Sequence, residues 1–148
     1  MIIQRVNRTN PEKVFIITRN DEGVTVPIGS PVNFKFDAVR DGLDVERAVT
    51  GGAVKTLLTA GLADAAIPTL QYGLVQCYGV RTDAVFLGTD SAQAVGNLLI
   101  ITHASNALMS VTAGAATEWL PAFACGVAQA TIAASTTTNT AVVFIRCM

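Results

Sequence analysis

The chain has 148 residues, which is enough for one domain with a sizeable core. Ten lysine and arginine residues against eleven aspartate and glutamate residues give a formal net charge of -1, which argues against a nucleic-acid binder and against a protein held by an anionic membrane surface. Charged residues are only 14% of the chain and hydrophobic residues 51%, so either the chain enters a membrane or other proteins cover much of its surface.

The sequence is typical of an all-β protein. Valine, isoleucine and threonine are frequent, and glycine, proline, asparagine and aspartate interrupt the chain about every eight to twelve residues, which is the spacing of short antiparallel strands. We therefore predict a compact antiparallel β-barrel or sandwich of short strands. Residues 1–12 are predicted to form an extended N-terminal arm and residues 13–148 a single β domain.

Turn-forming residues separate four predicted strands in the first fifty residues. These strands cover residues 14–18, 24–26, 32–36 and 43–49. In the last of them hydrophobic and polar residues alternate, which predicts one buried and one solvent-facing side. A short helix from Asp44 to Gly51 is the alternative, although a helix of about two turns is marginal by itself.

Seven further strands are predicted between residue 53 and the C-terminus. They lie near residues 54–63, 72–79, 84–88, 97–103, 107–112, 122–128 and 141–147. The run from Leu98 to Ile101 is hydrophobic on both sides, which predicts a central strand with both faces covered. Residues 113–118 could form no more than a short helical turn.

An internal similarity indicates two equivalent strand-loop-strand units, at residues 53–80 and 122–148. The motif GLADAAI at residues 61–67 is similar to GVAQATI at residues 126–132, and each is followed by a predicted strand. Aligning these strands predicts four residues that point into the core and four that share the opposite, partly polar face. The core residues are Val75, Cys77, Ile145 and Cys147, and the opposite face holds Leu74, Gln76, Phe144 and Arg146.

Neither a membrane span nor an export signal is predicted. The charge-free stretches at residues 91–117 and 119–145 are interrupted by polar residues and by Pro121, and the N-terminus has no hydrophobic run of signal-peptide length. Cys77, Cys125 and Cys147 match neither a disulfide framework nor a zinc pattern, so we interpret them as small buried side chains.

The sequence offers little catalytic or ligand-binding chemistry. His103 is the only histidine and lies in a hydrophobic strand, so a metal site would lack partners there. A Ser-His-Asp triad could be assembled from Asp90, His103 and Ser91 or Ser105, but neither serine lies in a nucleophile-elbow sequence. The run DGLDVE lacks the spacing of a cation loop, and its charges, Asp44 among them, are interpreted as solvated. We expect no catalytic residue, no cofactor and no metal.

Charge is distributed unevenly along the chain. Residues 1–48 hold fourteen of the twenty-one charged side chains, which leaves seven for the last hundred residues. Neighbouring subunits or a larger partner that cover this part of the chain would explain the shortage. The alternative is that threonine, serine, asparagine and glutamine form the solvent-exposed surface, since the chain has seventeen threonines.

A family resemblance adds to this pattern. A strand and turn, an SPVNF strand, the run DGLDVERAVTGGAVKTLLTAGLADAAIPTLQYGLVQCYGV, a strand near VGNLLI and the terminal VVFIRCM together resemble small head decoration, or cement, proteins of tailed bacteriophages. The resemblance covers residues 24–148 and consists of patterns, none of them catalytic. The charged stretch that ends at Glu12 has no counterpart.

The resemblance implies a virion protein without enzymatic activity. Such a protein is made in the cytoplasm of the host bacterium, docks on the outside of the capsid, commonly as a homotrimer between capsomers, and has the major capsid protein and its own copies as partners. Candidate interface residues are two cations of the arm, two aromatic residues of a loop and the mixed face described above: Arg5, Arg8, Trp119, Phe123, Leu74, Gln76, Phe144 and Arg146.

Two other classes of function fit the same pattern. A tail or fibre component of a virion would also be threonine-rich and poor in charge, although fibres usually show longer repeats. A small oligomeric β-barrel could build a ligand site across its subunits, where no single-chain motif would show it.

Overall fold

The computed structural model describes residues 12–35, 43–47, 59–87, 94–102, 107–110, 126–128 and 138–147. In these ranges the chain forms nine strands and no helix, which confirms the all-β class. The strands are β1 (Val14–Asn20), β2 (Pro31–Phe34), β3 (Asp44–Arg47), β4 (Thr59–Ala63), β5 (Tyr72–Leu87), β6 (Leu98–Thr102), β7 (Ala107–Ser110), β8 (Gly126–Ala128) and β9 (Thr138–Arg146).

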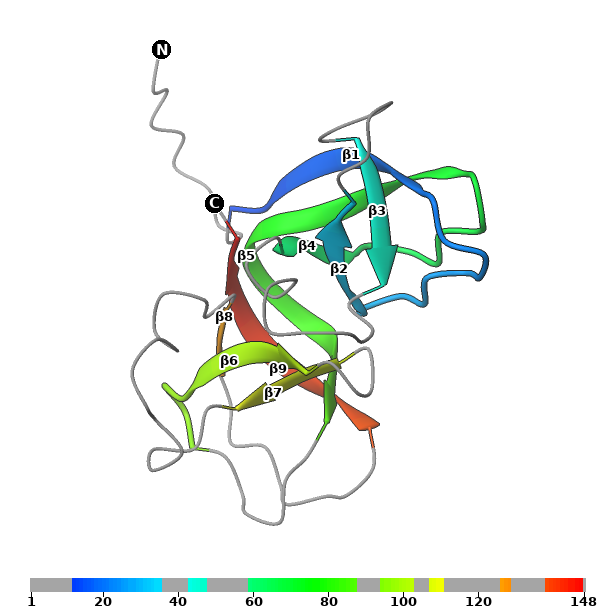
Figure 1. Ribbon diagram of the computed structural model, residues 1–148. Coiled ribbons are helices and arrows are strands. Elements are labelled where there is room, and N and C mark those ends of the chain that lie inside the picture. Colours follow the sequence, from blue (N-terminus) through cyan, green and yellow to red (C-terminus); the bar gives the residue numbers. More distant parts are fainter. Residues whose placement is uncertain are drawn as a thin grey trace, which may run out of the picture.

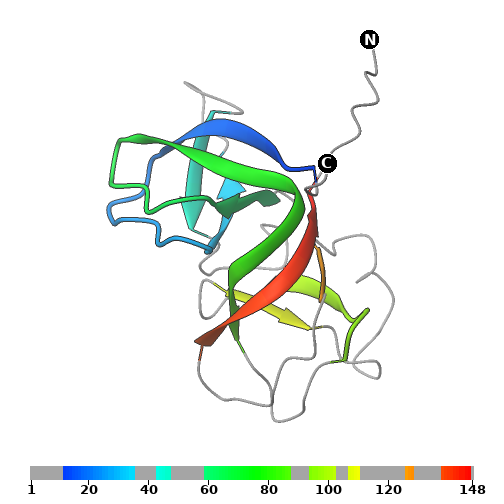
Figure 2. The same cartoon turned by 180° about the vertical axis from the view of Figure 1, so that it is seen from behind.

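The strands are hydrogen-bonded into two closed circuits that share β5 (Figures 1 and 2). The pairing order is β1-β3-β2-β4-β5-β7-β6-β8-β9, and β5 additionally pairs with both β1 and β9. We call β1 to β4 with the N-terminal half of β5 the first unit, and the C-terminal half of β5 with β6 to β9 the second unit. The long β5 strand crosses from one unit to the other.

The two units have the same topology. In the first unit the circuit runs β1-β3-β2-β4-β5 and in the second β5-β7-β6-β8-β9, so each strand of the first corresponds to the strand four places later in the chain. In each unit only the first and third strands pair in parallel, and the other pairings are antiparallel. The sheet is mixed, so the prediction of an antiparallel arrangement is wrong for these two pairs. The structure is therefore an internal duplication of a five-strand arrangement.

The sequence similarity between residues 61–67 and 126–132 matches this duplication, with one correction of register. Ala63 on β4 pairs with Val75, and Ala128 on β8 pairs with Val143, so Val75 corresponds to Val143 and not to Ile145. The predicted alignment of the following strands is thus wrong by two residues, because the loop between β8 and β9 is shorter than it assumed. A shift of two residues leaves the predicted faces unchanged, because side chains alternate along a strand.

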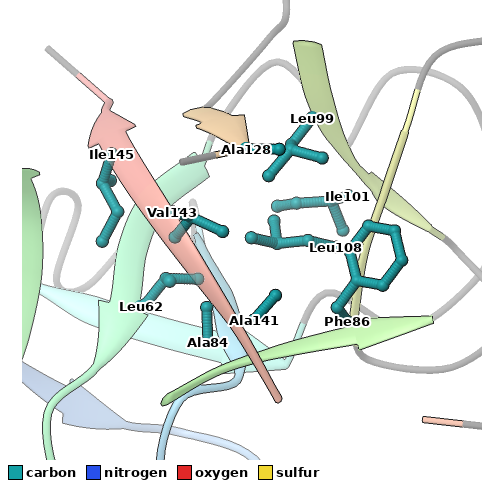
Figure 3. Packing of buried hydrophobic residues seen from close by; sticks show 10 residues of the cluster. All are labelled: Leu62, Ala84, Phe86, Leu99, Ile101, Leu108, Ala128, Ala141, Val143 and Ile145. Atoms are coloured by element: carbon teal, nitrogen blue, oxygen red, sulfur yellow. The ribbon is translucent and has the colours of Figure 1, made fainter. Parts of the chain in front are cut away.

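Each unit has its own hydrophobic core. The first core consists of Val26, Val32, Val45, Ala60, Ala63, Ile67 and Val75. The second, shown in Figure 3, consists of Leu62, Ala84, Phe86, Leu99, Ile101, Leu108, Ala128, Ala141, Val143 and Ile145. Leu62 lies on β4 of the first unit but packs in the second core, so β4 is covered on both faces where the units meet.

Most predicted strands are present, with two differences. Residues 72–79 and 84–88 were predicted as two strands, but they belong to the single strand β5, which has a register shift between Arg81 and Ala84. A bulge of this kind bends a strand without ending it. The predicted strand at residues 24–26 is reduced to one bridge between Val26 and Ile67. Residues 44–47 form a strand and not the alternative helix.

The strand β6 is central, as predicted, because it lies between β7 and β8. Its two faces are not both covered, however. Leu99 and Ile101 are buried in the second core, whereas Leu98 is exposed and Ile100 is half-buried. A strand that is central in a closed sheet needs only one covered face. The prediction that both faces of β6 are covered is therefore wrong, although hydrophobic residues lie on both faces.

Several predictions concern residues outside the described ranges. They include the N-terminal arm with Arg5 and Arg8, the predicted turn at residues 113–118, His103 and Cys125, and the aromatic residues Trp119 and Phe123. Within the described ranges, no helix is long and hydrophobic enough to cross a membrane.

Candidate interaction surface

The charged side chains at one end of the first unit pair with each other. Arg19 lies 3.3 Å from both Asp21 and Asp44, and Arg47 lies 3.0 Å from Glu22. The interpretation of Asp44 as a solvated charge is wrong, because Asp44 is buried and its partner Arg19 offsets the loss of hydration. Among the described residues no group of three or more histidine, cysteine, aspartate or glutamate side chains could hold a metal ion.

A second ion-pair group lies at the junction between the units. The guanidinium of Arg81 is buried, and its Nη1 donates to Asp64 at 3.0 Å while its Nε lies 2.8 Å from Asp83. Asp64 follows β4 and Asp83 lies in the bulge of β5, so these contacts join β4 to β5 where the second unit begins. We interpret the group as structural.

The interpretation of the cysteines as small buried side chains is confirmed for Cys77. Cys77 is buried in β5, and its Sγ donates to the backbone oxygen of Val14 at 3.4 Å. Burial raises the pKa of Cys77, which keeps the thiol protonated and a poor nucleophile. Cys147 is half-buried and packs against the second core.

Of the four predicted interface residues in the described ranges, three are exposed or half-buried and one is buried. Leu74 and Arg146 are exposed, and Phe144 is half-buried. Phe144 packs edge to face against Tyr78 of its own chain, with ring centroids 5.1 Å apart. Gln76 is 0% exposed, so the prediction that it lies on an open face is wrong.

The position of Gln76 at the junction explains its burial. Gln76 pairs directly with Leu62, so the two side chains lie on the same side of the sheet. That side faces outward in the first unit, but at this point it meets the second unit, whose core contains Leu62. The Gln76 amide Nε2 donates to the backbone oxygens of Tyr78 and Val80 at 3.1 and 3.3 Å. A pattern of alternation cannot reveal such coverage, because it comes from residues far away in the sequence.

Four exposed hydrophobic side chains of β1 and β5 form what we call the apolar stripe. Phe15, Ile17, Tyr72 and Leu74 are 37%, 65%, 60% and 45% exposed. Ile17 pairs directly with Leu74, and Tyr72 pairs with Arg19 two residues farther along β1, so the side chains lie on one face. The opposite face of β1 carries the buried side chains of Thr18 and Asn20.

The adjoining exposed hydrophobic side chains on one face of the sheet make the apolar stripe the candidate interaction surface. The largest such patch on a typical monomer covers about 300–600 Å² and often serves binding. The sequence analysis found Leu74 but missed Phe15, Ile17 and Tyr72. The signal was present in VFIIT at residues 14–18, which is hydrophobic on both sides and therefore indicates a strand with both faces covered.

Comparison with known proteins assigns no family. No protein-family model matches the chain, and no curated protein matches it.

Proposed function

We propose that the protein is a structural virion protein that binds the outer surface of a bacteriophage capsid and stabilises it by bridging capsomers. In this proposal the domain is a compact β-barrel or sandwich, its partners are the major capsid protein and its own copies, and it acts as a homotrimer on the capsid exterior. The apolar stripe is the observation that carries the proposal, because a bridging protein obtains its binding energy from hydrophobic surface buried between subunits.

The strand pairing supports a mechanical role. Every strand pairs with two neighbours in one of the closed circuits, and the 16-residue strand β5 belongs to both. A load applied to one unit would therefore pass to the other through a continuous backbone and through the ladders that β5 forms with β1 and β9. Such a protein can transmit tension between two binding partners without unfolding one half.

The charge distribution supports contact with other subunits. In the described part of the second unit the only ionisable side chains of the aspartate, glutamate, lysine and arginine types are Arg81, Asp83 and Arg146. Two of these three are paired with each other. A surface with so few charges loses little hydration energy when a neighbour covers it.

Mass action explains how such contacts stabilise a shell. A subunit that binds only the assembled lattice stabilises that lattice by an amount that grows with its free concentration relative to its dissociation constant. Binding at more than one point adds avidity, because the second contact forms at high effective concentration.

Electron microscopy of decorated heads tests the proposal. Purified protein is mixed with undecorated phage heads, and heads without added protein serve as the control. Density over every capsomer junction supports the proposal. Density at a single vertex indicates a tail or fibre component, and the absence of bound density on all heads overturns the proposal.

A further inference from the structure

We propose that a second copy of this chain covers the apolar stripe, with Ile17 and Leu74 at the centre of the contact. The proposal deepens the proposed function and rests on its premise that the stripe is a binding surface. Three features of the stripe identify the occupant: its absence from the duplicated unit, its lack of charge and its size.

The internal duplication shows which residues the same fold accepts at the β5 positions of the stripe. Val75 of the first unit corresponds to Val143 of the second, so Leu74 corresponds to Val142 and Tyr72 to Thr140. Thr140 is exposed and polar, and Val142 is a smaller side chain that is half-buried. The exposed tyrosine and leucine are therefore particular to the first unit.

The β1 side of the stripe differs between the units in the same direction. Ile17 pairs with Leu74, and the place opposite Val142 in the second unit is taken by the bulge of β5. That bulge holds Thr82, which is exposed, and Asp83, which is half-buried. Polar residues thus occupy the place of the most exposed member of the stripe. Because the same strand arrangement forms with polar residues in the places of Tyr72 and Ile17, these two hydrophobic side chains need an explanation outside the domain.

The charges around the stripe exclude a highly charged occupant. The stripe itself contains no formal charge. Arg19, the neighbour of Tyr72 across the strands, is already paired with Asp21 and Asp44. The exposed residues just before the stripe, Glu12 and Lys13, have opposite signs. An anionic membrane or a nucleic acid would be drawn by an excess of cations, which this surface does not offer.

The stripe is complementary to itself. An uncharged hydrophobic surface fits another surface of the same kind. Every further copy of the chain carries the same stripe and therefore offers such a surface. A standard interface buries about 800 Å² per partner, which is more than four partly exposed side chains supply. The four side chains would thus form the hydrophobic centre of a contact whose rim comes from neighbouring polar residues.

The substitutions that test this proposal are taken from the second unit. In the double variant, Tyr72→Thr introduces the residue that β9 carries at the equivalent position, and Leu74→Thr introduces a side chain of the size and shape of Val142 that carries a hydroxyl group. Ile17→Thr is a second stripe variant that keeps a β-branched residue in β1. The matched control is Val95→Thr, which replaces a hydrophobic side chain that is 61% exposed in a turn of the second unit.

Sedimentation equilibrium of the purified full chains, without capsids, gives the result. We expect the wild type and Val95→Thr to form dimers or trimers at micromolar concentration, and the double variant and Ile17→Thr to associate at least tenfold more weakly with unchanged circular dichroism. A monomeric wild type at ~100 μM overturns the proposal, and so does equal association of all four proteins. If the double variant does not fold, Ile17→Thr decides.

The failure of this proposal and the failure of the proposed function give different results. Binding of the wild type to undecorated heads without self-association in solution refutes the stripe contact and keeps the capsid role. Self-association through the stripe without binding to heads supports this contact and refutes the capsid role.

Discussion

Ala63 and Ala128 occupy the same position in the two units, and their backbones form the same pair of hydrogen bonds. The oxygen of Ala63 accepts from the amide of Gly29 at 2.9 Å, and its amide donates to Ser30 at 3.0 Å. The oxygen of Ala128 accepts from Gly96 at 3.0 Å, and its amide donates to Asn97 at 3.0 Å. The duplication therefore extends from the strand order to single hydrogen bonds in the turns that precede β2 and β6.

The two turns give a prediction in which one residue serves as the control for the other. Gly29 has φ 73° and Gly96 has φ 92°, so alanine is strained at both positions. A Cβ at Gly29 would lie 2.1 Å from the backbone oxygen of Asp83, whereas a Cβ at Gly96 meets nothing within 4 Å. We expect Gly96→Ala to lower the free energy of unfolding by about 1 kcal/mol and Gly29→Ala by about 3 kcal/mol or more.

Urea denaturation followed by circular dichroism measures both glycine variants. Equal losses of stability in Gly29→Ala and Gly96→Ala would contradict the close approach of the first turn to β5.

Asn20 is expected to be essential for the stability of the first unit. It is buried, its Nδ2 donates to the oxygens of Val24 and Ile67 at 2.9 and 2.8 Å, and its Oδ1 accepts from the amide of Glu22 at 3.0 Å. Asn20→Ala removes these three hydrogen bonds. The Ile67 oxygen keeps its bond from the amide of Val26, and we expect a loss of about 2–4 kcal/mol of unfolding free energy. The control is Asn139→Ala on β9, where the side chain is exposed and a change within about 0.5 kcal/mol is expected.

Thermal or urea unfolding of the two asparagine variants provides the comparison. A loss below about 1 kcal/mol in Asn20→Ala would show that water replaces its hydrogen bonds and that the segments around Val24 and Ile67 are held by other contacts.

Leu62 is expected to couple the stability of the two units. It lies on β4 and packs in the second core, so Leu62→Ala opens a cavity between the units and should cost about 2–5 kcal/mol. We expect amide hydrogen exchange at Val32 and at Leu99, one in each core, to accelerate by the same factor. Leu70→Ala, at an exposed turn position, is the control and should leave both rates almost unchanged.

Faster exchange at Leu99 alone would show that the second unit opens independently. The shared strand β5 would then not make the two units one cooperative structure.

The buried thiol predicts how stability changes in alkaline solution. Burial raises the pKa of Cys77 in the folded protein, so above the ordinary thiol pKa of about 8.5 the unfolded chain loses a proton that the folded chain keeps. The folded state then binds more protons than the unfolded state, and the free energy of unfolding falls as pH rises from about 8.5 to the raised pKa. Below that range Cys77 contributes no slope.

Comparison of the wild type with Cys77→Ala isolates this contribution, because all other titrating groups are common to both proteins. We expect a shallower loss of stability between about pH 8 and 10 in the variant. If the free energy of unfolding falls with pH equally in both proteins over that range, Cys77 has an ordinary pKa in the folded protein.

Local sequence patterns predicted the strands because each depends on its own residues. Alternation at residues 43–49 and the β-branched run at 14–18 place strands where the structure has β3 and β1. Similar motifs at residues 61–67 and 126–132 also marked equivalent strands. The predicted length of the loop between β8 and β9 was wrong, and with it the register of β9. That register depends on pairing with the strand β8 and not on the intervening residues.

The same limit applies to the interaction surface. Leu74 and Gln76 have the same parity on β5, and a pattern of alternation assigns them the same exposure. Leu74 is exposed and Gln76 is buried because only Gln76 lies beside Leu62, where the second unit covers the first. Phe15 and Ile17 joined the surface because β1 pairs with β5 across more than fifty residues of sequence.

The amino-acid sequence by itself determined that this chain forms short strands, that it carries few charges after residue 48 and that two of its segments are related. Only the tertiary structure decided that the strands close into two circuits around β5 and that four hydrophobic side chains stay outside both cores. The physical reason is that strand propensity and alternation act between neighbouring residues, whereas closure and coverage depend on hydrogen-bonded partners that are distant in the chain.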